Sequence, residues 1–424
     1  MPHTARDTAF AQAVDEYLGW YGDPLASLNA ALDADPGFLL GYTTIAALNA
    51  LGGVPGTAEP IQSALRSAQA LATNASTSEK LHLKAAQHWA HGEITEAAKI
   101  WELALAENPR DLLALHLAHD THFFLGDAEK LRDIPLSVLS AQEEQKSRGY
   151  VLGMAAFGLE ETGDYAAAEK AGREAIEINP ADSWAAHAVA HVLEMQSRGA
   201  EGITWLRGLE AHWTQAPALA VHQYWHLCLY LLEEGTPGEV LTIYDSKLRP
   251  ALTAPLLDLV DAAALLWRLE LLGENVGNRW QHIAAAWGQY ALDHVLAFND
   301  VHIAFTLEAA GDRTRLAEQA ASLKTYIATG TENARLTAEI GLPLIQSLHA
   351  FRQGDFARTV SLMAPIRARL HEIGGSHAQR DLFIQTLIIA AFRANQDDLA
   401  RQFLTERQAK KSGIARAFLP YLPK

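Results

Sequence analysis

The sequence predicts an all-α fold in which pairs of helices repeat along the chain. Three observations predict it: a glycine turn signal recurs at a nearly constant interval, small and apolar residues follow helical spacing between these turns, and no stretch alternates as a β-strand would. Hydrophobic residues make up 49% of the 424 positions, which is enough for a continuous core.

The turn signal is a glycine, often followed by Asp or Glu, between two helical patterns. Successive signals lie between 34 residues apart, as from Gly22 to Gly56, and 43 apart, as from Gly311 to Gly354. A period near 34 residues is typical of tetratricopeptide repeats. We therefore expect a tetratricopeptide-like α-α superhelix of about eleven helix pairs, forming a single domain over residues 1–424. The signals are Gly22, Gly56, Gly92, Gly126, Gly163, Gly199, Gly235, Gly273, Gly311, Gly354 and Asn395.

The clearest repeat covers residues 150–180. Its second helix places Ala168, Ala171 and Ala175 on one face, and small residues at this spacing let two helices approach closely. Pro180 ends that helix, because proline cannot continue it. The repeat therefore has the turn, the small-residue face and the stop that a helix pair needs.

Charge and cysteine content narrow the classes of function. The formal net charge is −16, which disfavours binding to nucleic acid or to anionic membranes. The sequence contains one cysteine, Cys228, no secretory signal and no apolar run long enough to span a membrane, so we expect a cytoplasmic protein. Cys228 is expected in the core, and Lys410-Lys411 is expected to be a solvated helix end.

Several polar stretches are more specific than a generic helical repeat. They are AHDTHFFLGD (118–127), INPADSWAAHAVAHVLEM (178–195), VHQYWHLCLYLLEEG (221–235), LTIYDSKLRP (241–250), GNRWQ (277–281), DHVLAFNDVH (293–302), GLPL (341–344) and GGSHAQRD (374–381). In this order, over roughly residues 20 to 410, they resemble the tetratricopeptide repeat protein 38 family. His122 departs from the family, where an aromatic residue is expected. The resemblance implies the repeat architecture and does not imply a reaction.

Histidines and acids recur at a similar height on successive first helices. First helices line the concave surface of tetratricopeptide arrays, so we expect these side chains to face one interior cavity. Arg380, early in a helix capped by Ser376, could meet an anionic ligand there, as could Arg279 from a loop. The candidate ligand-binding residues are His116, His119, His187, His191, Glu194, His222, His226, Asp261, Asp300, His302 and Arg380.

Two histidine pairs have the spacing of a metal site. His187 and His191 are four residues apart, and His222 and His226 repeat the interval one unit later. Two imidazoles at this spacing can hold one zinc ion or another divalent metal. Ala188 stands where the usual zinc-protease motif requires Glu. The alternative is that these histidines only hydrogen-bond neighbouring helices.

Two functions remain open from the sequence. The first is a binding protein that holds a small polar molecule or a peptide on its concave face. The second is a hydrolase or another acid–base enzyme, with or without a metal, that uses the same His/Asp/Glu cluster. Seven tryptophans between positions 184 and 287 fit either core packing or the wall of a ligand pocket. No Gly-rich phosphate loop and no nucleophile elbow is present.

Overall fold

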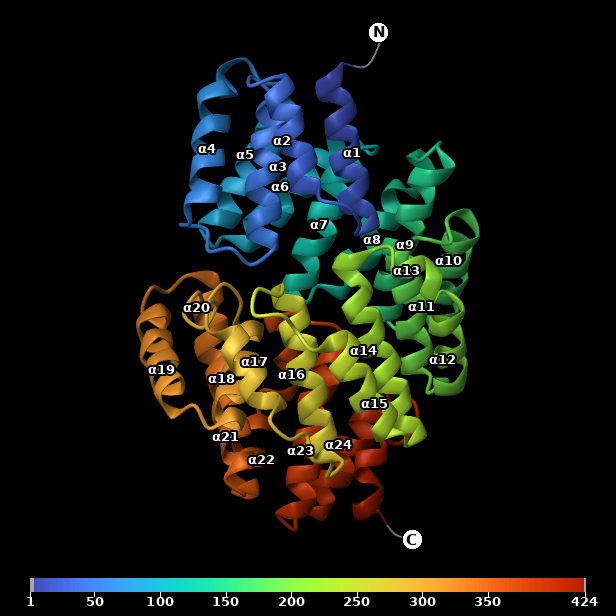
Figure 1. The fold of residues 1–424 in the computed structure, drawn as a ribbon, viewed down its shortest axis with the longest axis vertical. Helices are drawn as coiled ribbons and strands as arrows, with labels where there is room; N and C mark the ends of the chain where they lie inside the picture. The colour runs from blue at the N-terminus through green and yellow to red at the C-terminus, as the bar shows by residue number, and fades with distance from the viewer. Residues whose placement is uncertain (1–3, 423–424) are drawn as a thin grey trace. The chain divides into compact units, whose positions relative to one another are not determined.

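The computed structural model describes residues 4–422 and confirms the predicted all-α class (Figure 1). The structure is 77% helical, and residues 4–422 contain no β-strand. Consecutive helices pack in antiparallel pairs, which gives a tetratricopeptide-like array. No helix within this range is long and apolar enough to cross a membrane.

The chain forms two compact units, and each is described by itself; the single domain over residues 1–424 stays a prediction. The first unit comprises the chain up to Val189 together with Leu209–Ala220, and the second comprises Ala190–Gly208 and the chain from Val221 onward. Helices α11 (Ser183–Met195) and α14 (Pro217–Glu234) pass from one unit to the other.

The other helices belong wholly to one unit. Those of the first unit are α1 (Ala5–Gly19), α2 (Pro24–Ala34), α3 (Leu39–Leu51), α4 (Glu59–Leu71), α5 (Thr77–Ala90), α6 (Ile94–Glu107), α7 (Leu112–Leu125), α8 (Ala128–Val138), α9 (Gln145–Glu161), α10 (Tyr165–Ile178) and α13 (Glu210–Trp213). Those of the second unit are α12 (Gly199–Gly208), α15 (Pro237–Ile243), α16 (Leu256–Leu271), α17 (Arg279–Trp287), α18 (Ala297–Ala310), α19 (Arg313–Ile327), α20 (Glu332–Leu336), α21 (Leu342–Arg352), α22 (Phe356–Met363), α23 (His377–Arg393) and α24 (Asp397–Gln408).

The turn signals are left-handed residues at nine of the eleven expected positions, Asn395 included. Glycine adopts positive φ without the steric cost that a Cβ brings. At the other two positions the left-handed residue is a near neighbour: Gly53 instead of Gly56, and Ser197 instead of Gly199, which begins α12. Several glycines precede an aspartate that caps the next helix, as Asp164 does by accepting from the Ala167 N–H at 3.2 Å.

The repeat over residues 150–180 forms as predicted. Helices α9 and α10 pack against each other, and Ala168 and Ala175 are fully buried between helices. Gly158 of α9 lies so close to α8 that an added Cβ would stand 2.2 Å from the Leu131 backbone. Backbone contact of this kind requires glycine.

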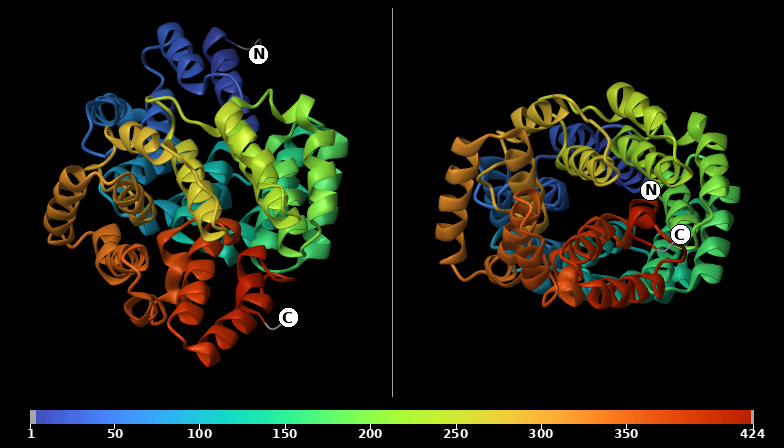
Figure 2. Two further views of the ribbon diagram at one scale, coloured as in Figure 1. Left: turned by 60° about the horizontal axis from the view of Figure 1, so that its bottom comes forward. Right: turned by 90° about the horizontal axis from the view of Figure 1, so that it is seen from below.

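In the second unit, two helices far apart in the sequence are in contact. Helix α16, in the yellow part of the ribbon in Figure 2, packs on α23, in the red part. Trp267 of α16 donates its indole N–H to Thr386 Oγ1 of α23 at 3.0 Å. Arg268, the next residue, donates to the Ala378 carbonyl at 2.7 Å. These bonds bring the polar residues of α16 next to those of α23.

The substitution Gly163→Ala is expected to destabilise the protein by about 1 kcal/mol, because Gly163 has φ +86° and nothing within 4 Å of an added Cβ. The cost is therefore conformational and not a clash. Urea unfolding measures it. Gly208→Ala is the control: Gly208 ends helix α12 and also has open space, so its free energy of unfolding should be unchanged or raised. An equal loss in both variants would contradict the explanation.

Candidate metal and ligand site

Three imidazoles meet in the core of the second unit. His191 comes from α11, and His222 and His226 come from α14; all three are buried. Their candidate ligand nitrogens lie within 4.8 Å of one another. The ring centroids of His191 and His226 are 4.4 Å apart, and those of His222 and His226 are 4.8 Å apart. We call these three residues the histidine triad.

Helix packing explains why the triad forms. His222 and His226 are four residues apart, so they lie on one face of α14. Tyr230, one turn further, donates its hydroxyl to the Ala190 carbonyl of α11 at 2.5 Å. Gly202 of α12 makes room for the Tyr230 ring, since an added Cβ would lie 2.4 Å from it. The face of α14 that carries the histidines is thus held against α11.

Two members of the triad are oriented by buried carboxylates. His222 Nδ1 lies 2.7 Å from Asp261 Oδ2, and His226 Nδ1 lies 3.2 Å from Glu194 Oε2. An ionised carboxylate only accepts, so Nδ1 carries the proton in each neutral ring and the lone pair is on Nε2. Trp225 stacks on the His222 ring at 5.2 Å and fixes its plane. Each carboxylate therefore orients its imidazole and leaves the lone pair on the other ring nitrogen, Nε2.

Burial favours the neutral form of His191 and His226. It lowers the pKa of His191 well below its usual value, and the neighbouring histidines lower it further. Burial also lowers the pKa of His226, although Glu194 opposes this effect. A neutral imidazole is the form that can coordinate a metal. At neutral pH these two rings therefore present lone pairs.

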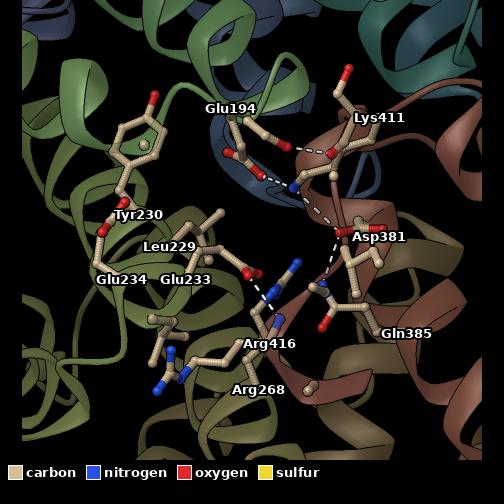
Figure 3. A pocket seen from close by; sticks show the side chains of 18 of the residues that line it. Glu194, Leu229, Tyr230, Glu233, Glu234, Arg268, Asp381, Gln385, Lys411 and Arg416 are labelled. Atoms are coloured by element: carbon tan, nitrogen blue, oxygen red, sulfur yellow. Dashed lines mark hydrogen bonds and ion pairs between the residues drawn. The ribbon is translucent and has the colours of Figure 1, made fainter. Parts of the chain in front are cut away.

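A chain of buried charges continues from Glu194. Lys411 Nζ lies 2.6 Å from Glu194 Oε1 and 3.4 Å from Asp381 Oδ2. Figure 3 shows Lys411 between these two carboxylates. Arg407 binds Asp381 through Nε at 2.7 Å and Nη2 at 2.8 Å. Burial would raise the pKa of Glu194, but Lys411 and His226 outweigh it and hold that pKa at about 2. Glu194 is therefore ionised between an imidazole and an ammonium.

Lys411 and Arg279 correct the sequence analysis. Lys411 was expected at a solvated helix end, but its side chain is only 12% exposed because two carboxylates bind its ammonium. Arg279 begins α17 instead of lying in a loop; its Nε and Nη2 donate to Asp245, and its Nη1 donates to the Val276 carbonyl.

Arg380 and Cys228 behave differently. Ser376 caps α23 as predicted, and the Arg380 guanidinium bonds to the Gly375 carbonyl beside that cap. The neighbouring Asp381, not singled out from the sequence, is the residue in the charged network. Cys228 is buried as expected, and burial raises the pKa of its thiol.

Asp300 and His302 have their own local partners. Asp300 accepts from His294 Nδ1 at 2.8 Å. His302 donates from Nδ1 to the Phe298 carbonyl at 2.8 Å, and its ring contacts Phe298 and Phe305. Within residues 4–422, no hydrogen bond joins either side chain to the histidine triad. Their place in a ligand site stays a prediction.

His116 and His119 of α7 lie in the first unit. The Tyr17 ring stacks on His116 at 4.1 Å, and the Tyr17 hydroxyl donates to Asp120 at 2.6 Å. Burial lowers the pKa of both histidines to about 3 and raises that of Asp120 to about 6. His122, given less weight because it departs from the family, contacts Glu102 at 3.0 Å.

His187 also belongs to the first unit. It lies four residues before His191 on α11, and its ring is 4.8 Å from that of Trp184. The expected interior cavity shared by His116, His187 and the triad stays a prediction. Five of the clustered tryptophans are fully buried among other core residues, which fits core packing: Trp213, Trp225, Trp267, Trp280 and Trp287.

The comparisons with known proteins add little. No protein-family model matches the sequence. Among solved structures, the human IFIT1 dimer with m7Gppp-AAAA is similar over 95% of this chain and 94% of that chain, with 10% sequence identity and a TM-score of 0.41. Similarity at this level carries no argument about function, so the function must be inferred from the residues themselves.

Proposed function

We propose that this chain is a binding protein of the tetratricopeptide repeat protein 38 family whose second unit holds one divalent metal ion, zinc by preference. The histidine triad supplies three ligands. His187, four residues before His191, stays the fourth ligand predicted from the sequence spacing alone. The bound ion would position a small polar molecule in the cytoplasm. The acidic net charge favours such a ligand over nucleic acid.

The observation that carries the proposal is the pair of carboxylate–imidazole contacts. Asp261 holds His222 at Nδ1, and Glu194 holds His226 at Nδ1. Metal-binding histidines commonly donate their other N–H to a carboxylate, which fixes the tautomer and raises the basicity of the ligand nitrogen. Here two such contacts converge on neighbouring imidazoles, and both carboxylates are buried.

The residues fit a zinc ion in chemistry and nearly in geometry. Zinc binds imidazole nitrogens at about 2.0–2.1 Å, so two nitrogens on one tetrahedral ion lie roughly 3.3 Å apart. The triad nitrogens lie within 4.8 Å of one another, so small side-chain rotations would bring them to that spacing. The negative charges of Asp261 and Glu194 would offset the charge of the ion.

A second candidate is an acid–base enzyme, which Asp258 favours. Asp258 is partly buried one turn before Asp261 on α16. Burial and the Asp261 charge raise its pKa to about 7, although His222 opposes them. A carboxyl group that titrates near neutral pH can both donate and accept a proton. Hydrolysis of a small molecule beside the metal is the matching reaction.

Metal analysis tests the proposal. The purified protein, dialysed against zinc and then against metal-free buffer, is expected to retain one zinc per chain by elemental analysis. Asp261→Asn should weaken zinc binding about 10–100-fold in competition titrations, because the amide orients His222 without a charge. Asp245→Asn is the control, since Asp245 lies on the surface beside Arg279. A protein that retains no zinc and shows no saturable uptake would refute the metal site.

A further inference from the structure

A pocket opens beside Glu194 within the second unit. Its volume is about 240 Å³, and residues from α11, α14, α16, α23 and α24 line it together with the segment 411–417 (Figure 3). This volume is below the roughly 300–1,000 Å³ that drug-sized ligands occupy, so the pocket suits a smaller molecule. Apart from Glu194, none of its lining residues belongs to the metal site proposed above.

Two buried guanidinium groups line this pocket with unused hydrogen-bonding capacity. Arg407 is 6% exposed and donates from Nε and Nη2 to Asp381. Its buried Nη1 makes no hydrogen bond to any group of residues 4–422. Arg268 is 5% exposed and donates only to the carbonyls of Ala264 and Ala378. No carboxylate of the described chain forms an ion pair with Arg268.

A buried guanidinium donor that has no hydrogen-bond partner is costly. An unsatisfied buried donor costs about 1–3 kcal/mol, and more when it is charged. Nearly all buried polar groups in proteins therefore find a partner, which can be a bound ligand. Arg407 Nη1 is such a group, and the buried Arg268, whose printed hydrogen bonds go only to carbonyls, lines the same pocket.

The charges of the buried lining favour an anion. Three cations, Arg268, Arg407 and Lys411, face two carboxylates, Glu194 and Asp381, which leaves an excess of one positive charge. The remaining charged lining residues, Glu233, Glu234 and Arg416, reach solvent, and burial of the Glu233 carboxyl group raises its pKa, which favours its neutral form. The inner part of the pocket is therefore positive although the whole chain is acidic.

We propose that this pocket binds a small oxyanion, the carboxylate or phosphate group of a low-molecular-weight ligand, between Arg268 and Arg407. Guanidinium groups match planar and tetrahedral oxyanions through paired hydrogen bonds. The Nη1 group of Arg407 supplies two N–H donors to the oxyanion. Arg268 supplies a second positive charge. The inference stands without the metal, because no group in it depends on the histidine triad.

The experiment is isothermal titration of the purified full-length protein with sodium acetate and, separately, inorganic phosphate, at constant ionic strength set by NaCl. At least one probe is expected to bind saturably, with a dissociation constant below roughly 10 mM. Stronger binding of acetate identifies a carboxylate ligand, and stronger binding of phosphate identifies a phosphate ligand. Arg268→Gln keeps a donor for the Ala378 carbonyl, removes the charge, and is expected to weaken binding at least tenfold.

The matched control is Arg401→Gln, because Arg401 lies on α24 like Arg407 but is 61% exposed and paired with Asp398. Its affinity should equal that of the unmodified protein. Circular dichroism verifies that Arg268→Gln is folded. Arg407→Lys provides a second variant that keeps the ion pair with Asp381 and removes Nη1, with the same expected loss. The proposal is overturned if neither probe binds saturably, or if both variants bind as tightly as the control.

Discussion

Asp381→Ala is expected to lower the free energy of unfolding by about 3–5 kcal/mol, because it leaves Arg407 as an uncompensated buried charge. Arg407 loses both of its bonds to the carboxylate, and Lys411 keeps only Glu194. Urea unfolding at pH 7, followed by circular dichroism, measures the loss.

The matched control is Asp398→Ala. Asp398 forms an ion pair with Arg401 on the surface, and exposed pairs contribute about 0–1 kcal/mol. Its free energy of unfolding should therefore change by less than about 1 kcal/mol. A similar small loss in Asp381→Ala would show that the charged network does not stabilise the second unit.

The same carboxylate makes stability depend on pH. Burial would raise the pKa of Asp381, but Arg407 and Lys411 outweigh it and hold the pKa well below its usual range. The unfolded chain therefore binds a proton at a higher pH than the folded chain does. The stabilisation is fully present above about pH 5 and is lost as pH falls below about 4. Urea unfolding gives the free energy of unfolding of Asp381→Asn and of the unmodified protein at pH 3 and at pH 6. The difference between the two proteins should be smaller at pH 3 than at pH 6.

Replacing His222 and His226 together by Ala is expected to abolish zinc retention, a loss of at least roughly 1,000-fold in affinity. Two of the three ligands of the triad disappear, and the remaining His191 cannot hold an ion without them. Competition titration against a zinc chelator measures the affinity. Circular dichroism should show nearly unchanged helicity, because the two helices also pack through the bond from Tyr230 to Ala190.

His349→Ala is the control for this pair. The His349 side chain is 55% exposed and forms an ion pair with Glu308, outside the histidine triad, so zinc retention should not change. If the double variant retained one zinc per chain, the histidine triad would not be the site. If it lost its helicity, His226→Gln would replace it, since glutamine can still donate to Glu194.

The periodic features of this sequence predicted the fold. The glycine turns were recognised because a left-handed residue must recur wherever one helix ends and its partner begins. The two misplaced positions, Gly56 and Gly199, each lie within three residues of the true turn, where several small residues compete for it. The four-residue spacing of His222 and His226 also predicted that they lie on one helix face, because four residues make about one helical turn.

Spacing could not predict contacts between distant helices. Asp261 was placed near the histidines by its height on a first helix, but Lys411, Arg407 and Asp381 meet only because separate helices pack together. One signal was available for Arg268: it is the single cation of LLDLVDAAALLWRLEL, in the last turn of that helix, and a charge in so apolar a helix needs a partner.

The contact between Lys411 and Glu194 joins residues 217 positions apart. Closing so long a loop costs conformational entropy before the contact contributes any stability, and distant contacts of this kind slow folding. During synthesis Glu194 and the triad leave the ribosome long before Lys411 does. During that interval Glu194 lacks its ammonium partner, Lys411, so the charged network around Glu194 is incomplete. We expect the site to reach its final charge state only as the last helices dock, which makes it a late event in the maturation of the protein.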